Sequence, residues 1–129
     1  MRRPVIPVVL AVTMLAAGCG GPSDEQQVAG TVSAFGRATA AKDYRTLCGK
    51  LLSPKLIEQV QQIGLPCEQA LQRALGDVQS PRLTIGKVTV DGDTATAEIR
   101  TSAAGQAPSR DVLQLARVKG DWRIASLGS

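Results

Sequence analysis

The chain has 129 residues, a length that suits one domain, and its formal charge of +4 comes from 15 Lys and Arg against 11 Asp and Glu. With Arg2 and Arg3 set apart, the charge is +2 (13 basic minus 11 acidic residues), and only three residues are aromatic, so no basic patch or stacking platform points to nucleic acid. The chain contains no histidine, which excludes acid–base chemistry and metal ligation by that residue.

The first 18 residues have the pattern of a secretory signal peptide. A short basic start is followed by an apolar run over residues 5–17. As a helix this run would be about 20 Å long, short of the ~30 Å hydrocarbon core of a bilayer. It therefore predicts a leader that is removed, not a membrane span.

Small residues lead directly into Cys19, in the sequence LAAGC. This stretch resembles the bacterial lipobox, in which the cysteine thiol is diacylated and becomes the new N-terminus. The usual leucine lies three residues before the cysteine, whereas Ala16 stands there in this chain and Leu15 lies one residue further back. The alternative is an ordinary signal peptide, cleaved nearby, that leaves Cys19 as a free thiol.

The lipobox resemblance implies how the chain is divided. Residues 1–18 would be a lipoprotein signal peptide, residues 19–23 the lipidated cysteine with a short Gly/Pro tether, and residues 24–129 the folded domain. Acyl chains such as palmitate on Cys19 would hold the protein on the extracytoplasmic side of a cell membrane. The tether is too short to let the domain move far from the bilayer.

Four helices are predicted in the first half of the domain. Ser23 and Gln26 have the spacing of a capping box, and Asp43 can cap the next helix. Ser53 is followed by a proline, which suits an N-cap and a first helical position. The helices are expected over residues 24–41, 44–52, 54–63 and 66–75.

Two cysteines, Cys48 and Cys67, remain if Cys19 is lipidated. In an exported domain the simplest interpretation is a disulfide, which would close a loop of roughly 20 residues and contribute about 3 kcal/mol in the chain-entropy view. A catalytic redox pair lacks its C-x-x-C spacing, and two thiols without histidine do not complete a tetrahedral metal site. The sequence favours a structural bridge that joins the helical half.

From Pro81 the hydrophobic period changes from about 3.6 to about 2 residues, which indicates strands. Gly86 interrupts the alternation of the first strand and predicts a bulge. Asp91-Gly92 is a strong hairpin signal, and residues 102–109 are expected to form a loop. The strands are expected over residues 83–90, 94–100, 112–118 and 122–127. Helices followed by four antiparallel strands predict an α+β fold, with the helices packed on one face of a curved sheet.

Two stretches, AAKDYRTLCGKLLSP and LARVKGDWRIASL, carry a resemblance to a known fold family. Together with the order of elements they are similar to the NTF2-like (cystatin-like, SnoaL-like) cone, over residues 24–127. The resemblance implies a cone-shaped cavity between the long helix and the sheet. The residues expected to line it are Val32, Phe35, Leu113, Leu115 and Trp122; the alternative is that they form a plain packed core.

No catalytic residue is predicted. The ketosteroid-isomerase branch of this fold uses carboxyl groups inside the cone, but no acidic residue falls on a clearly inward position. Asp111 is expected at a strand edge, Glu98 on the outward face, and the other strand-region acids lie in turns. We therefore expect a non-catalytic module of the cell envelope, without cofactor or metal, that binds a small apolar ligand or an envelope protein. The alternative is a ketosteroid-isomerase or SnoaL-like enzyme with a carboxyl group in the cone.

Overall fold

The computed structural model describes residues 2, 4 and 21–128 of the chain. Cys19, the expected lipidation site, lies outside these described residues, as does nearly all of the expected signal peptide. Helices come first and strands follow, in the order α1 (Asp24–Ala40), α2 (Tyr44–Thr46), the π-helix η1 (Leu47–Leu51), α3 (Pro54–Gln61), α4 (Cys67–Leu75), β1 (Arg82–Asp91), β2 (Thr94–Ala103), β3 (Gln106–Val118) and β4 (Asp121–Ser126). No helix in this described part combines the length and the apolar character that crossing a bilayer requires.

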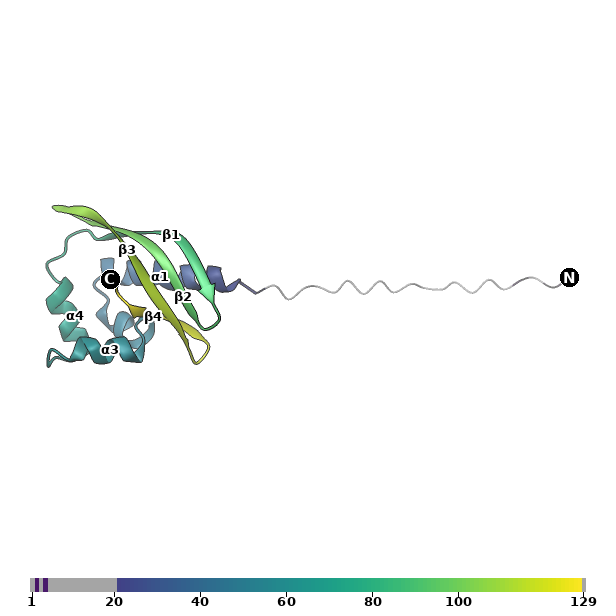
Figure 1. Cartoon of the computed structure of the whole chain (residues 1–129), viewed down its shortest axis with the longest axis horizontal. Helices are drawn as coiled ribbons and strands as arrows, with labels where there is room; N and C mark the ends of the chain where they lie inside the picture. Colours follow the sequence, from purple (N-terminus) through teal and green to yellow (C-terminus); the bar gives the residue numbers. More distant parts are fainter. Residues whose placement is uncertain (1, 3, 5–20, 129) are drawn as a thin grey trace.

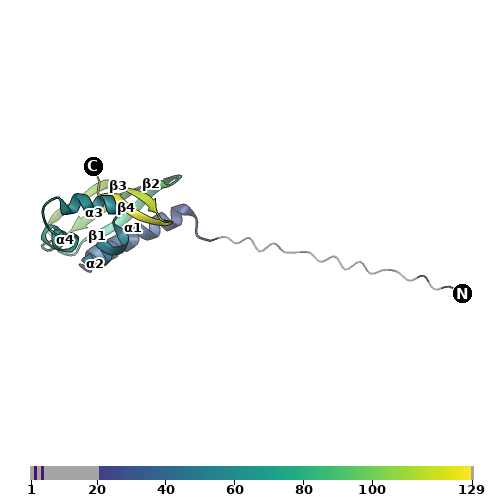
Figure 2. The same cartoon turned by 90° about the horizontal axis from the view of Figure 1, so that it is seen from below.

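The four strands form one antiparallel sheet in the order β1-β2-β3-β4, so each strand pairs with its neighbours in the sequence. The sheet curves over α1, and α3 and α4 lie beside one end of it (Figure 1). Turned by 90°, the molecule shows α1 and α2 below the strands and α3 beside β4 (Figure 2). The predicted α+β fold with helices on one face of a four-stranded sheet is confirmed.

The core lies between α1 and the sheet. In β2, Ala95, Ala97 and Ile99 are buried, while the residues between them are exposed, as strict alternation requires. In β1 the register shifts between Ile85 and Val88, which confirms the bulge expected at Gly86. The bulge returns the apolar residues of β1 to the face that packs on α1.

Capping residues fix the starts of the helices. The Ser23 hydroxyl accepts a hydrogen bond from the Gln26 backbone N–H, and the Gln26 side chain accepts one from Ser23, which completes the predicted capping box. Ser53 caps α3 through the Leu56 N–H. The third helix ends at Gln61, so Ile63, which was expected on its apolar face, is 65% exposed instead.

The expected loop over residues 102–109 is wrong, because β2 and β3 continue as one long hairpin whose turn is at Ala104 and Gly105. Thr101 lies opposite Ser109, and their hydroxyl oxygens are 2.9 Å apart. The Ala104 N–H also donates to the Gln79 carbonyl oxygen, which fastens the hairpin tip to the segment before β1. Small polar residues with weak strand propensity are held here by pairing across the ladder.

Replacing Asp43 with alanine should lower the melting temperature at neutral pH but not in strong acid. The Thr46 hydroxyl and the Thr46 backbone N–H both donate to the Asp43 carboxylate, and these bonds hold its pKa below the ordinary value of 3.8. These two hydrogen bonds stabilise the folded state fully when the pH is above the unfolded-state pKa of Asp43. The stabilisation is lost as the pH falls through the lower folded-state pKa. Melting curves of both proteins at about pH 7 and about pH 2 test this. In Asp43→Asn, whose amide caps the helix without titrating, the contribution of this cap to stability should not change with pH.

Candidate functional site

A cavity of about 290 Å³ lies between the second half of α1, helix α4 and the part of the sheet near the β2–β3 turn. This volume is close to the lower end of the range for small-molecule pockets, roughly 300 Å³. Most of the wall is apolar. The large apolar side chains that line it are Phe35, Leu47, Leu52, Leu71, Leu75, Leu83, Ile99, Leu113 and Leu127.

One wall of the cavity is fixed by the π-helix η1 and the disulfide. The Leu52 N–H donates to the Leu47 carbonyl oxygen at 2.9 Å, a bond that spans five residues and places both leucines in the wall. Cys48 in η1 is bonded to Cys67 at the start of α4, which confirms the predicted disulfide. Since Leu71 of α4 also lines the cavity, the bridge ties two of its walls together.

The five residues expected to line a cavity fall into two groups. Phe35 and Leu113 do line it. Val32, Leu115 and Trp122 do not; they are packed in the core, with 0%, 1% and 5% of their surface exposed. The reason is the length of β4, which pairs only with residues 114–118 of β3. Where β4 is present, the first half of α1 packs tightly against the sheet, and space remains only beyond it.

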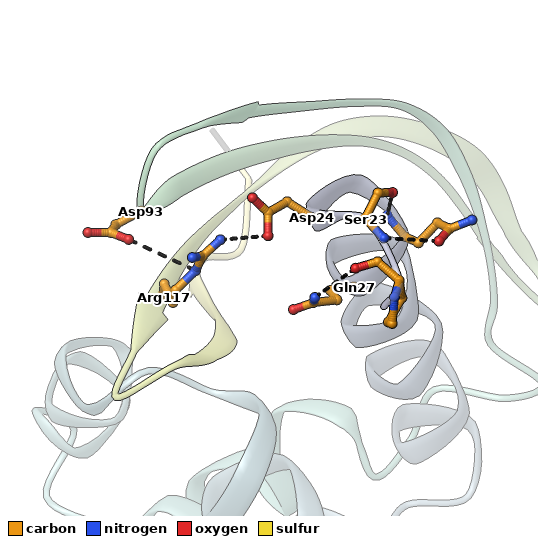
Figure 3. A network of polar contacts seen from close by, with 7 residues as sticks. Ser23, Asp24, Gln27, Asp93 and Arg117 are labelled. Atoms are coloured by element: carbon orange, nitrogen blue, oxygen red, sulfur yellow. Dashed lines mark hydrogen bonds and ion pairs between the residues drawn. The ribbon is translucent and has the colours of Figure 1, made fainter. Parts of the chain in front are cut away.

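The region around Trp122 is held together by an arginine. The Arg117 guanidinium lies 4.6 Å from the centre of the Trp122 ring, and its Nη2 is 2.8 Å from an Asp24 carboxylate oxygen. Asp93 lies 3.9 Å from the same guanidinium (Figure 3). These contacts join the start of α1 to the β1–β2 and β3–β4 turns, so Arg117 and Trp122 stabilise the fold at the end opposite the cavity.

A polar patch interrupts the apolar wall on the sheet side. It consists of Thr101, Ser109 and Asp111, which all line the cavity. Asp111 lies two residues before Leu113 on the same strand and opposite Ile99 on β2, so it shares their inward face. The Ser109 hydroxyl donates to Asp111 Oδ2 at 3.3 Å and is itself 2.9 Å from the Thr101 hydroxyl.

The inward position of Asp111 corrects the expectation that no acidic residue lies in the cone. The sequence placed Asp111 at a strand edge because residues 102–109 were expected to be a loop. Since β3 begins at Gln106, Asp111 is an ordinary inward position of a long strand. Asp111, Leu113 and Leu115 occupy every second position of the strand, and this period of two is the signal that could have identified Asp111 as an inward residue.

No curated protein sequence is significantly similar to the chain. Residues 67–127 match a family model described as "Putative lumazine-binding". Among solved structures, an NTF2-like protein of unknown function from Silicibacter pomeroyi is 19% identical with a TM-score of 0.56, over 78% of this chain and 88% of that one. A de novo designed NTF2-fold protein is 20% identical with a TM-score of 0.55, over 81% and 85% of the two chains. The chain has the NTF2-like fold.

A third similar structure is described as a "putative dehydratase from the NTF2-like family" of Streptomyces avermitilis. It is 18% identical with a TM-score of 0.54, over 78% of this chain and 90% of that one. At these identities the likeness concerns the fold alone. Within this fold, the end of the cone where α1 begins is packed, and the cavity lies at the other end.

The hollow end of the NTF2-like cone offers apolar contacts and hydrogen-bond acceptors. Within residues 21–128, no group of three or more Cys, Asp or Glu side chains is placed to hold a metal ion. Beside a large apolar surface, the wall provides the Asp111 carboxylate, the Arg82 guanidinium, the Gln106 amide and the hydroxyl groups of Thr39, Thr101, Ser102 and Ser109.

Proposed function

We propose that this protein binds a small, largely apolar ligand in the cavity, as a non-catalytic module held at the outer side of a cell membrane. The observation that carries the binding part is the hollow of about 290 Å³ next to an otherwise packed core. Packed interiors rarely leave voids of this size without use. The family description of residues 67–127 supports a small ligand, and the open cavity favours a ligand over docking of an envelope protein.

Replacing Leu75 with tryptophan should fill the cavity and weaken binding of a neutral apolar fluorophore such as aminoanthracene by about tenfold or more. Leu75 is half-buried on α4 and lines the cavity. The matched control is Ile57→Trp, because Ile57 is half-buried on α3 and does not line the cavity. Fluorescence titration measures both affinities. Equal affinity in the two variants, or no saturable binding by the unmodified protein, would contradict ligand binding in this cavity.

The membrane anchor is proposed to be Cys19. Helix α1 begins at Asp24, five residues after Cys19, and the cavity is lined by the other half of the same helix. A helix of 17 residues is about 25 Å long. The second half of α1 lies at the end of the domain away from Asp24 (Figure 1), and its residues Phe35, Gly36 and Thr39 line the cavity. An anchor at Cys19 leaves the cavity free to exchange ligand with the surrounding aqueous phase.

Replacing Cys19 with serine should abolish acylation and move the exported protein from the membrane fraction to the soluble fraction. The thiol is the group that is alkylated, and a hydroxyl is a much weaker nucleophile. Fractionation of a bacterial host and the intact mass of the purified protein measure the change. The control is Cys48→Ser, which should remain with the membrane. An intact mass without acyl chains in the unmodified protein would reject the anchor.

One observation favours a second function, namely an isomerase- or dehydratase-like enzyme. Asp111 places a carboxylate in the cavity wall, where it could remove a proton from the carbon next to a carbonyl group. The test is exchange of solvent deuterium into a small apolar ketone such as phenylbutanone, followed by NMR with the unmodified protein and with Asp111→Asn. Exchange that the unmodified protein accelerates and the variant does not would support the enzyme. Exchange at the rate of the buffer in both would exclude it.

A further inference from the structure

We infer that the ligand carries one amine group on an apolar body, and that the ammonium lies against Asp111. This inference rests on the proposed binding function and names the class of ligand. The polar patch of Thr101, Ser109 and Asp111 lies on the sheet, as do the other polar residues of the lining except Thr39, whose hydroxyl donates to the Phe35 carbonyl oxygen. A ligand that fills the cavity therefore needs one polar end and an apolar remainder. The apolar end would face the leucine side chains from η1 and α4.

The charge of the cavity wall favours a cation. The ion pairs found among residues 21–128 both involve Arg117, at the other end of the domain, and none involves Asp111. Among the residues that line the cavity, Arg82 is the only basic one, and it is exposed at the start of β1. Arg110 precedes Asp111 and therefore projects from the opposite face of β3. The Asp111 carboxylate therefore has no ion-pair partner among the described residues.

The hydrogen bonds of Asp111 leave room for further donors. A carboxylate has about four lone-pair sites, and the Ser109 hydroxyl occupies one of them, at 3.3 Å from Oδ2. An ammonium group has three N–H donors and no acceptor, which suits this vacancy. Hydrogen bonds between an ammonium and a carboxylate are also about twice as strong as those between neutral groups.

The same geometry disfavours the two other classes of apolar ligand. A fatty acid or phosphate ester would bring a second negative charge next to Asp111, and like charges at short range repel. A pure hydrocarbon would cover the carboxylate without giving it a partner, which costs free energy because a buried charge needs hydrogen bonds. An amine with a body the size of a phenylbutyl group satisfies both the charge and the apolar wall.

The test uses three ligands with one skeleton and different heads, namely phenylbutylamine, phenylbutanol and phenylbutanoate. Their affinities at about pH 7 are measured by displacement of aminoanthracene from the purified protein. We expect the amine to bind about tenfold more tightly than the alcohol, and the carboxylate to bind most weakly. Asp111→Asn should remove the advantage of the amine and leave the affinity for the alcohol within about twofold.

Asp77→Asn is the matched control, because Asp77 is an exposed acid in the segment before β1 and does not line the cavity. It changes the net charge as much as Asp111→Asn does, but should leave the preference for the amine intact. Equal affinity for the three heads, or an amine preference that persists in Asp111→Asn, would overturn the ligand class while leaving cavity binding in place. If aminoanthracene does not bind and none of the three ligands binds by calorimetry, the proposed function fails as well.

Discussion

Replacing Ile124 with alanine should lower the free energy of unfolding by about 3 kcal/mol, whereas replacing Phe35 with alanine should lower it by only about 1.5 kcal/mol. Ile124 is fully buried, and its carbonyl oxygen accepts a hydrogen bond from the Ser53 N–H at 2.8 Å. It lies at the bridge to Leu52, where the sheet meets the helical half. Truncation there leaves a new void that the surrounding backbone cannot close.

Phe35 provides the contrast because its ring borders a space that already exists. It is half-buried and lines the cavity, so its removal enlarges a hollow and breaks fewer close contacts. Urea unfolding of both variants measures the two losses, and the slope against denaturant should stay unchanged if only stability is affected. A loss for Phe35→Ala as large as that for Ile124→Ala would show that the ring is fully packed and the cavity smaller than described.

Local signals in the sequence were sufficient for the starts of the capped helices and for the bulge in β1. Ser23 and Asp43 cap helices because a side-chain oxygen satisfies backbone N–H groups that the helix itself leaves free, and this depends on neighbouring residues only. The bulge near Gly86 follows from a change of parity that is visible in the sequence. The order of helices and strands then restricts the fold to a sheet covered on one face.

The position of the cavity could not be predicted, because it depends on how far one strand pairs with another. β4 ends at Ser126, and this leaves the end of the sheet near Asp111 without a fourth strand. The sequence contains apolar residues on both halves of α1, and nothing local distinguishes Val32, which is packed, from Phe35, which faces space. The same limit applies to the β2–β3 hairpin, whose tip is held by pairing and not by propensity.

The π-helix shows how tertiary contacts override local preference. The segment from Leu47 to Leu51 has the composition of an ordinary helix, and a short helix was expected there. Arg123 of β4 directs Nη1 towards the Gly49 and Leu52 carbonyl oxygens, both at 3.4 Å. The wider turn of the π-helix directs Leu47 and Leu52 into the cavity, and the Arg123 guanidinium donates to carbonyl oxygens at its C-terminal end.

Removing the disulfide, by reduction or by the double change Cys48→Ala and Cys67→Ala, should lower the free energy of unfolding by about 3 kcal/mol. The bond joins residues that are 19 apart in the sequence, so it restricts the unfolded chain considerably. Urea unfolding with and without reductant measures the effect. The double variant is its own control, because reductant should shift the unmodified protein and leave the variant unchanged.

Removal of the disulfide should also weaken ligand binding, because the bond connects η1 to the first turn of α4 and both elements supply side chains to the cavity wall. Without it, α4 is held by apolar packing against the core and by the Lys42 ammonium, which donates to the carbonyl oxygen of its C-cap Gly76, and its wall of Leu71 and Leu75 becomes less ordered. We therefore expect the affinity for aminoanthracene to fall about threefold to tenfold in the double variant under conditions where it remains folded. If the stability falls and the affinity does not, then the cavity walls are positioned by packing alone. The disulfide would then act by restricting the unfolded chain and not by ordering the site.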